Sequence, residues 1–255
     1  MMKKVLAAAL LCAVSSFATW DYFPVQEAGK GEAKVGFGYL IPAEKMSSMA
    51  LNFGARYSII EGLEAAVMLN KGDAGFVLTC SVDSNDCGDP NKTGLNQPIV
   101  GVRYWLPMGL GIAVDVTIPA GGKNLVGDEP QLGLNAGLQY STKFTEELAL
   151  GAEALVTVID KLSKDASNGM NLNAALELDY SVGAVTPFVG IDLQQGLSKG
   201  DKQEASKMTL GFSVGTTCDI NESMYAQVGY WMGLAGDAYK DYAPKTIYVD
   251  YGIKF

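Results

Sequence analysis

The chain has 255 residues, of which 48% are hydrophobic and 18% charged, whereas roughly 25% are charged in a typical soluble domain. Its 30 glycines disfavour a mainly helical protein, because glycine destabilises helices and suits turns, bulges and strands around a narrow space. The formal charge of −9 argues against a nucleic-acid partner, since phosphate binding needs clustered Lys and Arg.

Residues 1–18 are expected to be a signal peptide that is cleaved after Ala18. It has a basic start, "MMKK", a short apolar run, "VLAAALLCAV", and small residues in "SFA" at the cleavage site. The remaining chain carries 17 Lys plus Arg against 28 Asp plus Glu, a net charge of −11. Residues 19–32 would be a short periplasmic segment. An N-terminal anchor helix and a lipoprotein modified at Cys12 are the alternatives, disfavoured by the short run and by bulky Leu11.

Beyond this segment, apolar and polar residues alternate with a period of two, as in strands with one apolar and one polar face. In "PIVGVRYWL" (98–106), for example, Gly101, Arg103 and Trp105 share the face opposite the valines. The same pattern predicts about twelve strands, most of them near the ~9–11 residues with which a tilted strand crosses a membrane. They span 33–41, 48–59, 62–70, 97–106, 109–118, 130–142, 146–158, 169–181, 183–195, 206–218, 222–234 and 245–255.

Short turns and longer loops alternate strictly between these strands. The short turns are 60–62, 107–109, 143–147, 181–184 and 219–223, and the longer loops are 42–48, 71–96, 119–129, 159–168, 196–205 and 235–244. Outer-membrane barrels show this asymmetry, with short periplasmic turns and longer outer loops. We therefore predict an all-β, up-and-down antiparallel transmembrane β-barrel over residues 33–255, with both termini in the periplasm. A secreted soluble β-barrel is the alternative.

The apolar face is predicted to contact lipid, and the polar face to line the lumen. The candidate lumen and selectivity residues are Arg56, Glu64, Arg103, Asp115, Glu153, Glu177, Asp179, Asp192, Asp250 and Lys254. With Lys34 added, this face has seven acids and four bases, which predicts a narrow, mildly acidic lumen with a mild preference for cations.

Four tyrosines close strands on the apolar face, near the short turns, in repeats such as "GARYS" and "GVRYW". They are Tyr57, Tyr104, Tyr140 and Tyr180. Tyrosine favours membrane–water boundaries, so an aromatic belt is predicted there, although tyrosine is also simply a good strand residue.

The three cysteines that follow the signal peptide are Cys80, Cys87 and Cys218. Export to an oxidising compartment predicts a Cys80–Cys87 disulfide that clips the loop 71–96. Cys218 is then left reduced near the end of a strand.

The chain contains no His, which removes Ser–His and Cys–His catalysis and HExxH metal sites. Glu177 and Asp179 share one strand face, which leaves a carboxylate-only hydrolase as an alternative to a hydrated lumen wall. The loop 83–94 has EF-hand-like spacing, but Gly94 stands where calcium binding requires Glu. No enzyme activity, metal site or cofactor is expected.

The last residues, "YVDYGIKF", alternate apolar and polar side chains up to the terminal Phe255. Val249, Tyr251, Ile253 and Phe255 share the apolar face, and this arrangement resembles the assembly signal of Gram-negative outer-membrane β-barrel proteins. The resemblance implies an outer-membrane location and recognition by the barrel-assembly machinery. Pairing of this strand with the first one, around "KVGFGYLI", would remove both sheet edges.

Three strand–turn–strand stretches, "ARYSIIEGLEAAVML", "LQYSTKFTEELALGAEALV" and "TTCDINESMYAQVGYWMGL", resemble hairpins of outer-membrane transporters grouped with the phenol-degradation-type barrel family. That resemblance implies passage of small, often hydrophobic molecules, although the loop between Cys80 and Cys87 departs from the family. We expect a monomeric, porin-like channel for passive passage of a small solute. The alternatives are a structural or adhesive barrel with a closed lumen that acts through its outer loops, and an autotransporter-type translocator.

Overall fold

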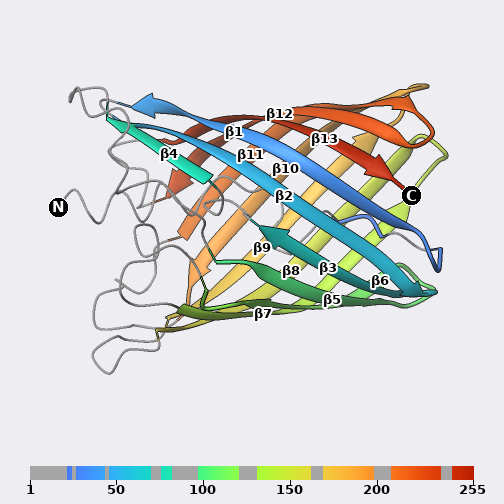
Figure 1. Ribbon diagram of the computed structural model, residues 1–255, viewed down its shortest axis with the longest axis horizontal. Coiled ribbons are helices and arrows are strands. Elements are labelled where there is room, and N and C mark those ends of the chain that lie inside the picture. The colour runs from blue at the N-terminus through green and yellow to red at the C-terminus, as the bar shows by residue number, and fades with distance from the viewer. Residues whose placement is uncertain are drawn as a thin grey trace.

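The computed structural model describes residues 22–24, 27–43, 46–69, 76–81, 97–120, 131–161, 169–197, 208–236 and 243–255. Within these ranges no helix is long and apolar enough to cross a membrane. Thirteen strands form one antiparallel sheet that closes on itself (Figure 1). They are β1 (Gly31–Ala43), β2 (Met46–Ile60), β3 (Leu63–Leu69), β4 (Phe76–Ser81), β5 (Ile99–Trp105), β6 (Leu110–Thr117), β7 (Gln131–Lys143), β8 (Leu148–Lys161), β9 (Gly169–Tyr180), β10 (Val185–Gly196), β11 (Met208–Asn221), β12 (Met224–Gly236) and β13 (Lys245–Lys254).

The strands β3 and β4 lie end to end along the same neighbour, β2. Phe53 of β2 pairs with Leu69 of β3, and Leu51 pairs with Phe76 of β4. The thirteen strands therefore occupy twelve positions around the barrel, which confirms the predicted up-and-down barrel of about twelve strands.

Two of the predicted loops are partly wrong. The strand β4 lies within the expected loop 71–96. Its short run "FVLTCS" follows polar and glycine residues in the sequence, and these interrupt the alternating pattern that would have indicated a strand. The expected loop 42–48 is mostly strand, because β1 extends to Ala43 and β2 begins at Met46.

The barrel closes where β1 pairs with β13. Their register runs over ten residue pairs, from Glu32 opposite Lys254 to Ile41 opposite Lys245. At one end of this seam, the Gly31 N–H donates to the Phe255 carbonyl over 2.8 Å, and the Phe255 N–H donates to the Gly31 carbonyl over 3.0 Å. The predicted pairing of the last strand with "KVGFGYLI" is confirmed, and neither strand presents a free edge along this seam.

Five short connections lie at the barrel end that also holds Phe255, on the right in Figure 1. They are residues 61–62, 106–109, 144–147, 181–184 and 222–223, at the places where the sequence predicts short turns. Two of them contain a glycine with φ of +79°, Gly62 and Gly109, a conformation that residues with a Cβ rarely adopt.

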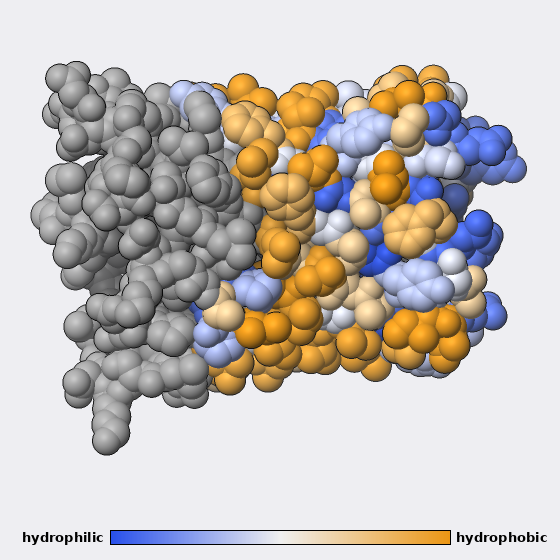
Figure 2. All heavy atoms as spheres, viewed as in Figure 1, coloured by the Kyte–Doolittle hydropathy of each residue, from blue (hydrophilic) through white to orange (hydrophobic). Residues whose placement is uncertain are grey.

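The side chains divide strictly between the two faces of the wall. In β5 the outward residues Val100, Val102 and Tyr104 are 39–50% exposed, whereas the inward residues Arg103 and Trp105 are 1% and 7% exposed. Figure 2 shows hydrophobic residues gathered over the visible wall and hydrophilic residues concentrated near the end with the short turns. A soluble barrel would bury its apolar face, so this distribution defines a barrel of the transmembrane type.

Candidate functional site

The structure places most of the candidate lumen residues inside the barrel. Seven of them face inward and are at most 9% exposed, namely Arg56, Glu64, Arg103, Asp115, Glu153, Glu177 and Asp192. Asp179 and Asp250 are half-buried at inward positions. Lys254 is exposed near the end with the short turns, where its Nζ lies 2.9 Å from Asp219 Oδ1.

A row of alternating charges, which we call the charge ladder, crosses the inner wall from β1 to β6. It consists of Glu32, Arg56, Glu64, Arg103 and Asp115, whose side chains are at most 8% exposed. The closest N–O distances are 2.5 Å for Arg56–Glu32, 3.8 Å for Arg56–Glu64, 3.3 Å for Arg103–Glu64 and 4.0 Å for Arg103–Asp115.

Strand register explains this ladder, because inward residues on adjacent strands become neighbours. Glu64 of β3 lies opposite Arg103 of β5, and Glu32 of β1 lies opposite Arg56 of β2. Each buried carboxylate thus lies beside a guanidinium, which offsets the cost of removing both charges from water. Glu32 was not among the sequence candidates, because residue 32 was assigned to the periplasmic segment rather than to the first strand.

The interior also carries aromatic side chains that the sequence analysis did not single out. Trp105, Phe188, Tyr225 and Trp231 face inward and are at most 7% exposed, and Tyr248 is half-buried at an inward position. Each ring lies against a glycine of a neighbouring strand, where a methyl group would overlap or crowd it: Gly111, Gly215, Gly252, Gly211 and Gly229, respectively. Glycines therefore make room for rings inside this barrel. Only Trp105 was assigned to the polar face from the sequence. The other aromatic residues could have been found from their alternation with the outward apolar residues of the same strand.

The inner wall from β7 to β12 carries a second polar group. Trp231 donates its indole N–H to Asp192 Oδ1 over 2.7 Å, and Gln139 Nε2 donates to Glu153 Oε2 over 3.1 Å. All four residues are buried. This wall joins carboxylates to an amide and an aromatic ring, whereas the charge ladder joins carboxylates to guanidinium groups.

Part of the chain that precedes β1 lies inside the barrel. Tyr22 is 1% exposed and its side chain lies against inward-facing Gly151, while Arg56 Nη1 donates to the Phe23 carbonyl over 2.6 Å. Burial, with the nearby carboxylates of Glu153 and others of this wall, raises the pKa of the Tyr22 phenol well above its usual value, so the ring is neutral. The expectation of a periplasmic segment over 19–32 did not anticipate this position.

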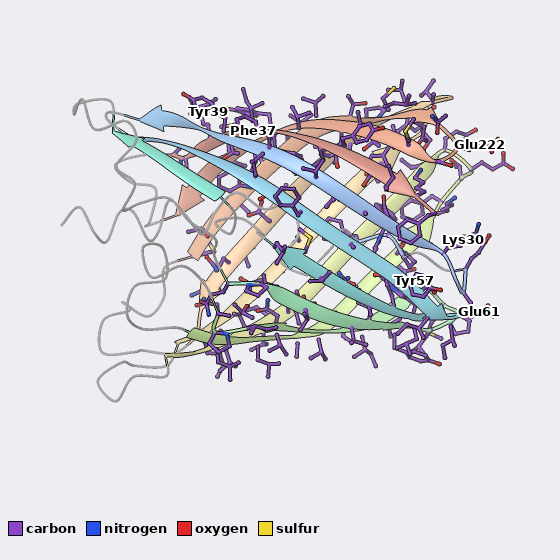
Figure 3. All side chains as sticks on the ribbon, viewed as in Figure 1. Lys30, Phe37, Tyr39, Tyr57, Glu61 and Glu222 are labelled. Carbon is purple, nitrogen blue, oxygen red and sulfur yellow. The ribbon has the colours of Figure 1, made fainter. Side chains whose placement is uncertain are left out.

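The remaining sequence candidates lie away from the interior. Tyr57, Tyr104, Tyr140 and Tyr180 are 40–52% exposed on the outer face. Figure 3 shows Tyr57 near the end where Lys30, Glu61 and Glu222 project. Val249, Tyr251, Ile253 and Phe255 are 41–56% exposed and also face outward. Cys218 is free and exposed. The Cys80 side chain, Cys87 and the stretch 83–94 lie outside the described residues.

A hollow of about 500 Å³ opens on the outer face rather than into the lumen. Its outward-facing lining includes the small residues Ala152, Ala154 and Ala174, with Leu138 and Leu176 beside them. Hydrocarbon would cover this apolar surface in a bilayer, so the hollow is separate from the polar interior.

A closed wall with an apolar outside and a polar inside defines the class of outer-membrane β-barrel folds. No known family model matches the chain, and no curated protein matches its sequence. The chain is similar to the crystal structure of the COG4313 outer membrane channel from Pseudomonas putida F1, with a TM-score of 0.67 and 15% identity. That match covers 92% of this chain and 98% of the channel.

Two further solved structures share the fold. The NanC porin gives a TM-score of 0.57 and 9% identity over 88% of this chain and 100% of the porin. The translocator domain of the autotransporter NalP from Neisseria meningitidis gives 0.50 and 11%, over 100% of this chain and 94% of that domain. Because the sequence identities are only 9–15%, the similarity to these three structures establishes the fold of the chain alone.

Proposed function

We propose that this protein is a porin-like channel of the outer membrane through which a small solute diffuses passively. The observation that carries the proposal is that Tyr22, which belongs to no wall strand, fills part of the interior. Because Tyr22 is not hydrogen-bonded into the sheet ladder, it can leave the interior without opening the wall. A passage along polar side chains would then be exposed.

Two observations support this proposal. The similar structures from Pseudomonas putida and of NanC are described as a channel and a porin. The inner wall also carries Glu153, Glu177 and Asp192 beyond the charge ladder, and an excess of acids in a pore favours cations. We propose a mild cation preference on this basis.

The proposal extends to location and assembly. The apolar wall requires a bilayer, and export by a cleaved signal peptide would deliver the chain to the outer membrane. There the barrel-assembly machinery would recognise the outward residues of β13, including Tyr251 and Phe255. We propose that the barrel acts as a monomer; its wall is completed by the strands of one chain.

A structural or adhesive barrel is the second candidate, and it is favoured by side chains of the wall itself that fill the interior. The inward side chain of Leu155 is fully buried and packs with Ala113, and both residues belong to wall strands. If these contacts never open, the protein would act through its outer loops.

Single-channel recording in planar bilayers separates the two functions. Wild-type protein and Tyr22→Ala are compared with Tyr57→Ala, which changes an outward tyrosine. We expect Tyr22→Ala to increase the conductance and Tyr57→Ala to leave it unchanged, with a reversal potential that shows cation preference. A barrel that is folded by heat-modifiable gel mobility but conducts no ion in any variant would favour the structural role. Anion selectivity would contradict the proposed lumen.

A further inference from the structure

The inner wall from β8 to β12, against which Tyr22 lies at Gly151, contains two adjacent rows of paired inward residues. One row is Gly151, Glu177, Gly190, Ser213 and Trp231, and the other is Glu153, Ala175, Asp192, Gly211 and Gly233. In both rows small residues alternate with acids over most of their length. The positions above three of these glycines are occupied by side chains: Tyr22 lies over Gly151, Ser213 over Gly190, and Asp192 with Trp231 over Gly211. We call this surface the glycine recess.

The recess already holds a ring from the protein's own chain. The Tyr22 side chain lies against Gly151 so closely that a Cβ on this glycine would overlap it. Its phenol interacts electrostatically with Glu153, Glu177 and Asp192. The recess therefore accommodates a six-membered ring with a hydroxyl group.

The polar groups at the recess are mainly hydrogen-bond acceptors. Carboxylates accept hydrogen bonds through both oxygens, and those of Glu153, Glu177 and Asp192 interact electrostatically with the Tyr22 phenol. Gln139, which is 1% exposed and donates to Glu153, has an Oε1 atom without a hydrogen-bond partner in the described part of the chain. A single phenol hydroxyl can donate only one hydrogen bond. The site suits a ligand with several donors.

We infer that the glycine recess is a binding site for a neutral, polyhydroxylated ring of the saccharide class, and that Tyr22 occupies this site as an internal ligand. The inference rests on the proposed channel function and names its solute class. Two aromatic residues lie on this side of the interior, Trp231, which donates its indole N–H to Asp192, and Tyr248, which interacts electrostatically with Tyr22. Charge-assisted hydrogen bonds from ligand hydroxyls to the carboxylates fix the orientation of the ligand. An acidic sugar is rejected, because its carboxylate would meet Glu177 and Asp192 at close range.

Isothermal titration calorimetry of the folded, detergent-solubilised full-length barrel tests the site. The probes are D-glucose, D-glucuronate and phenol. D-Glucose is expected to bind Tyr22→Ala about tenfold more tightly than wild type, because the competing ring is gone. In the Tyr22→Ala background, Asp192→Asn is expected to weaken glucose binding about tenfold, through loss of a charge-assisted acceptor. Asp219→Asn, near the barrel end, is the matched control and leaves binding unchanged.

Heat-modifiable gel mobility identifies the variants that fold. Tyr22→Ser replaces Tyr22→Ala if the alanine variant does not fold. The effect of Asp192→Asn on glucose binding can also be measured with Tyr22 in place, by comparing wild type with the single variant Asp192→Asn at higher glucose concentration. Absence of glucose binding in the folded variants, insensitivity to Asp192→Asn, or tighter binding of phenol or glucuronate than of glucose would overturn the inference. Conductance without glucose binding would overturn the saccharide site alone, whereas glucose binding without conductance would overturn the channel alone.

Discussion

Arg56 on β2 donates a hydrogen bond from Nη1 to the backbone carbonyl of Phe23 over 2.6 Å, so a side chain of the barrel wall holds the segment that fills the interior. The same guanidinium donates from Nε to Glu32 Oε2 over 2.8 Å, and both side chains are buried. Glu32 thereby orients Arg56 toward the segment. The charge ladder thus has a second role besides neutralising buried acids, because one end of it anchors residues 22–24.

Substitution Arg56→Lys is expected to loosen this anchor while it keeps the positive charge beside Glu32. An ammonium lacks the planar set of donors that lets one guanidinium bind a carboxylate and a carbonyl together. Single-channel recordings should then show a higher conductance or more frequent opening than in wild type. Lys30→Arg, an exposed change at the barrel end with the short turns, serves as the control. Recordings indistinguishable from wild type, from a barrel with normal heat-modifiable mobility, would contradict the anchor.

Removal of Arg103 should destabilise the barrel strongly. In Arg103→Leu, buried Glu64 and Asp115 lose the guanidinium that lies 3.3 Å and 4.0 Å from them, although Glu64 keeps Arg56 at 3.8 Å. Removing one partner of a buried ion pair costs about 3–5 kcal/mol. Urea titration of the barrel in lipid vesicles measures this loss. The double variant Arg103→Leu with Glu64→Leu should recover part of the stability, because one of the two carboxylates that Arg103 neutralised is gone. A double variant less stable than Arg103→Leu would argue against the ladder.

Deletion of Phe255 should impair assembly more than conductance. It removes the two backbone hydrogen bonds with Gly31 at the end of the β1–β13 seam and an outward ring that is 56% exposed. We expect lower amounts of heat-modifiable protein in the outer-membrane fraction, with unchanged conductance for the molecules that do fold. Phe255→Tyr, which keeps both the ring and the backbone, is the control. Wild-type amounts of the deletion variant in this fraction would refute the assembly role.

A methyl group on Gly137 should cost stability, whereas one on Gly38 should not. At Gly137 the added Cβ would overlap the Ala154 carbonyl and lie 2.8 Å from the Leu155 Cα, so backbone atoms would have to move. At Gly38 its nearest neighbour, Thr246 Cγ2, is 4.0 Å away. Overpacking of this kind costs about 1–3 kcal/mol. Urea midpoints of Gly137→Ala and Gly38→Ala provide the comparison, and equal midpoints would show that the wall adjusts freely.

Strand positions and faces could be predicted because both depend on local patterns. The alternation around Val100 and Arg103 specifies which residues meet lipid and which meet the lumen, and the five short turns follow from their polar and glycine residues. Prediction was wrong where the pattern is short or interrupted. The strand β4 has only six residues, and in the sequence polar and glycine residues separate it from β3.

The interior could be predicted only in part. The alternation of apolar and polar residues placed Glu64 and Arg103 on the inner face. Their contact, however, depends on the register between β3 and β5, which the sequence of one strand does not specify. The pairing of Trp231 with Asp192, and of Tyr248 with Gly229, depends on register in the same way. Tyr22 belongs to no alternating pattern, so no periodicity could place it inside the barrel.

The seam between β1 and β13 has a consequence for the order of folding. Most neighbouring strands are consecutive in the chain and can pair as local hairpins, whereas Glu32 and Lys254 come from opposite ends of the sequence. Contacts between distant residues are slow to form, because the loop entropy is lost before they contribute any stability. The last contact to form therefore joins the earliest and latest parts of the barrel. Until then, two sheet edges stay available to other chains.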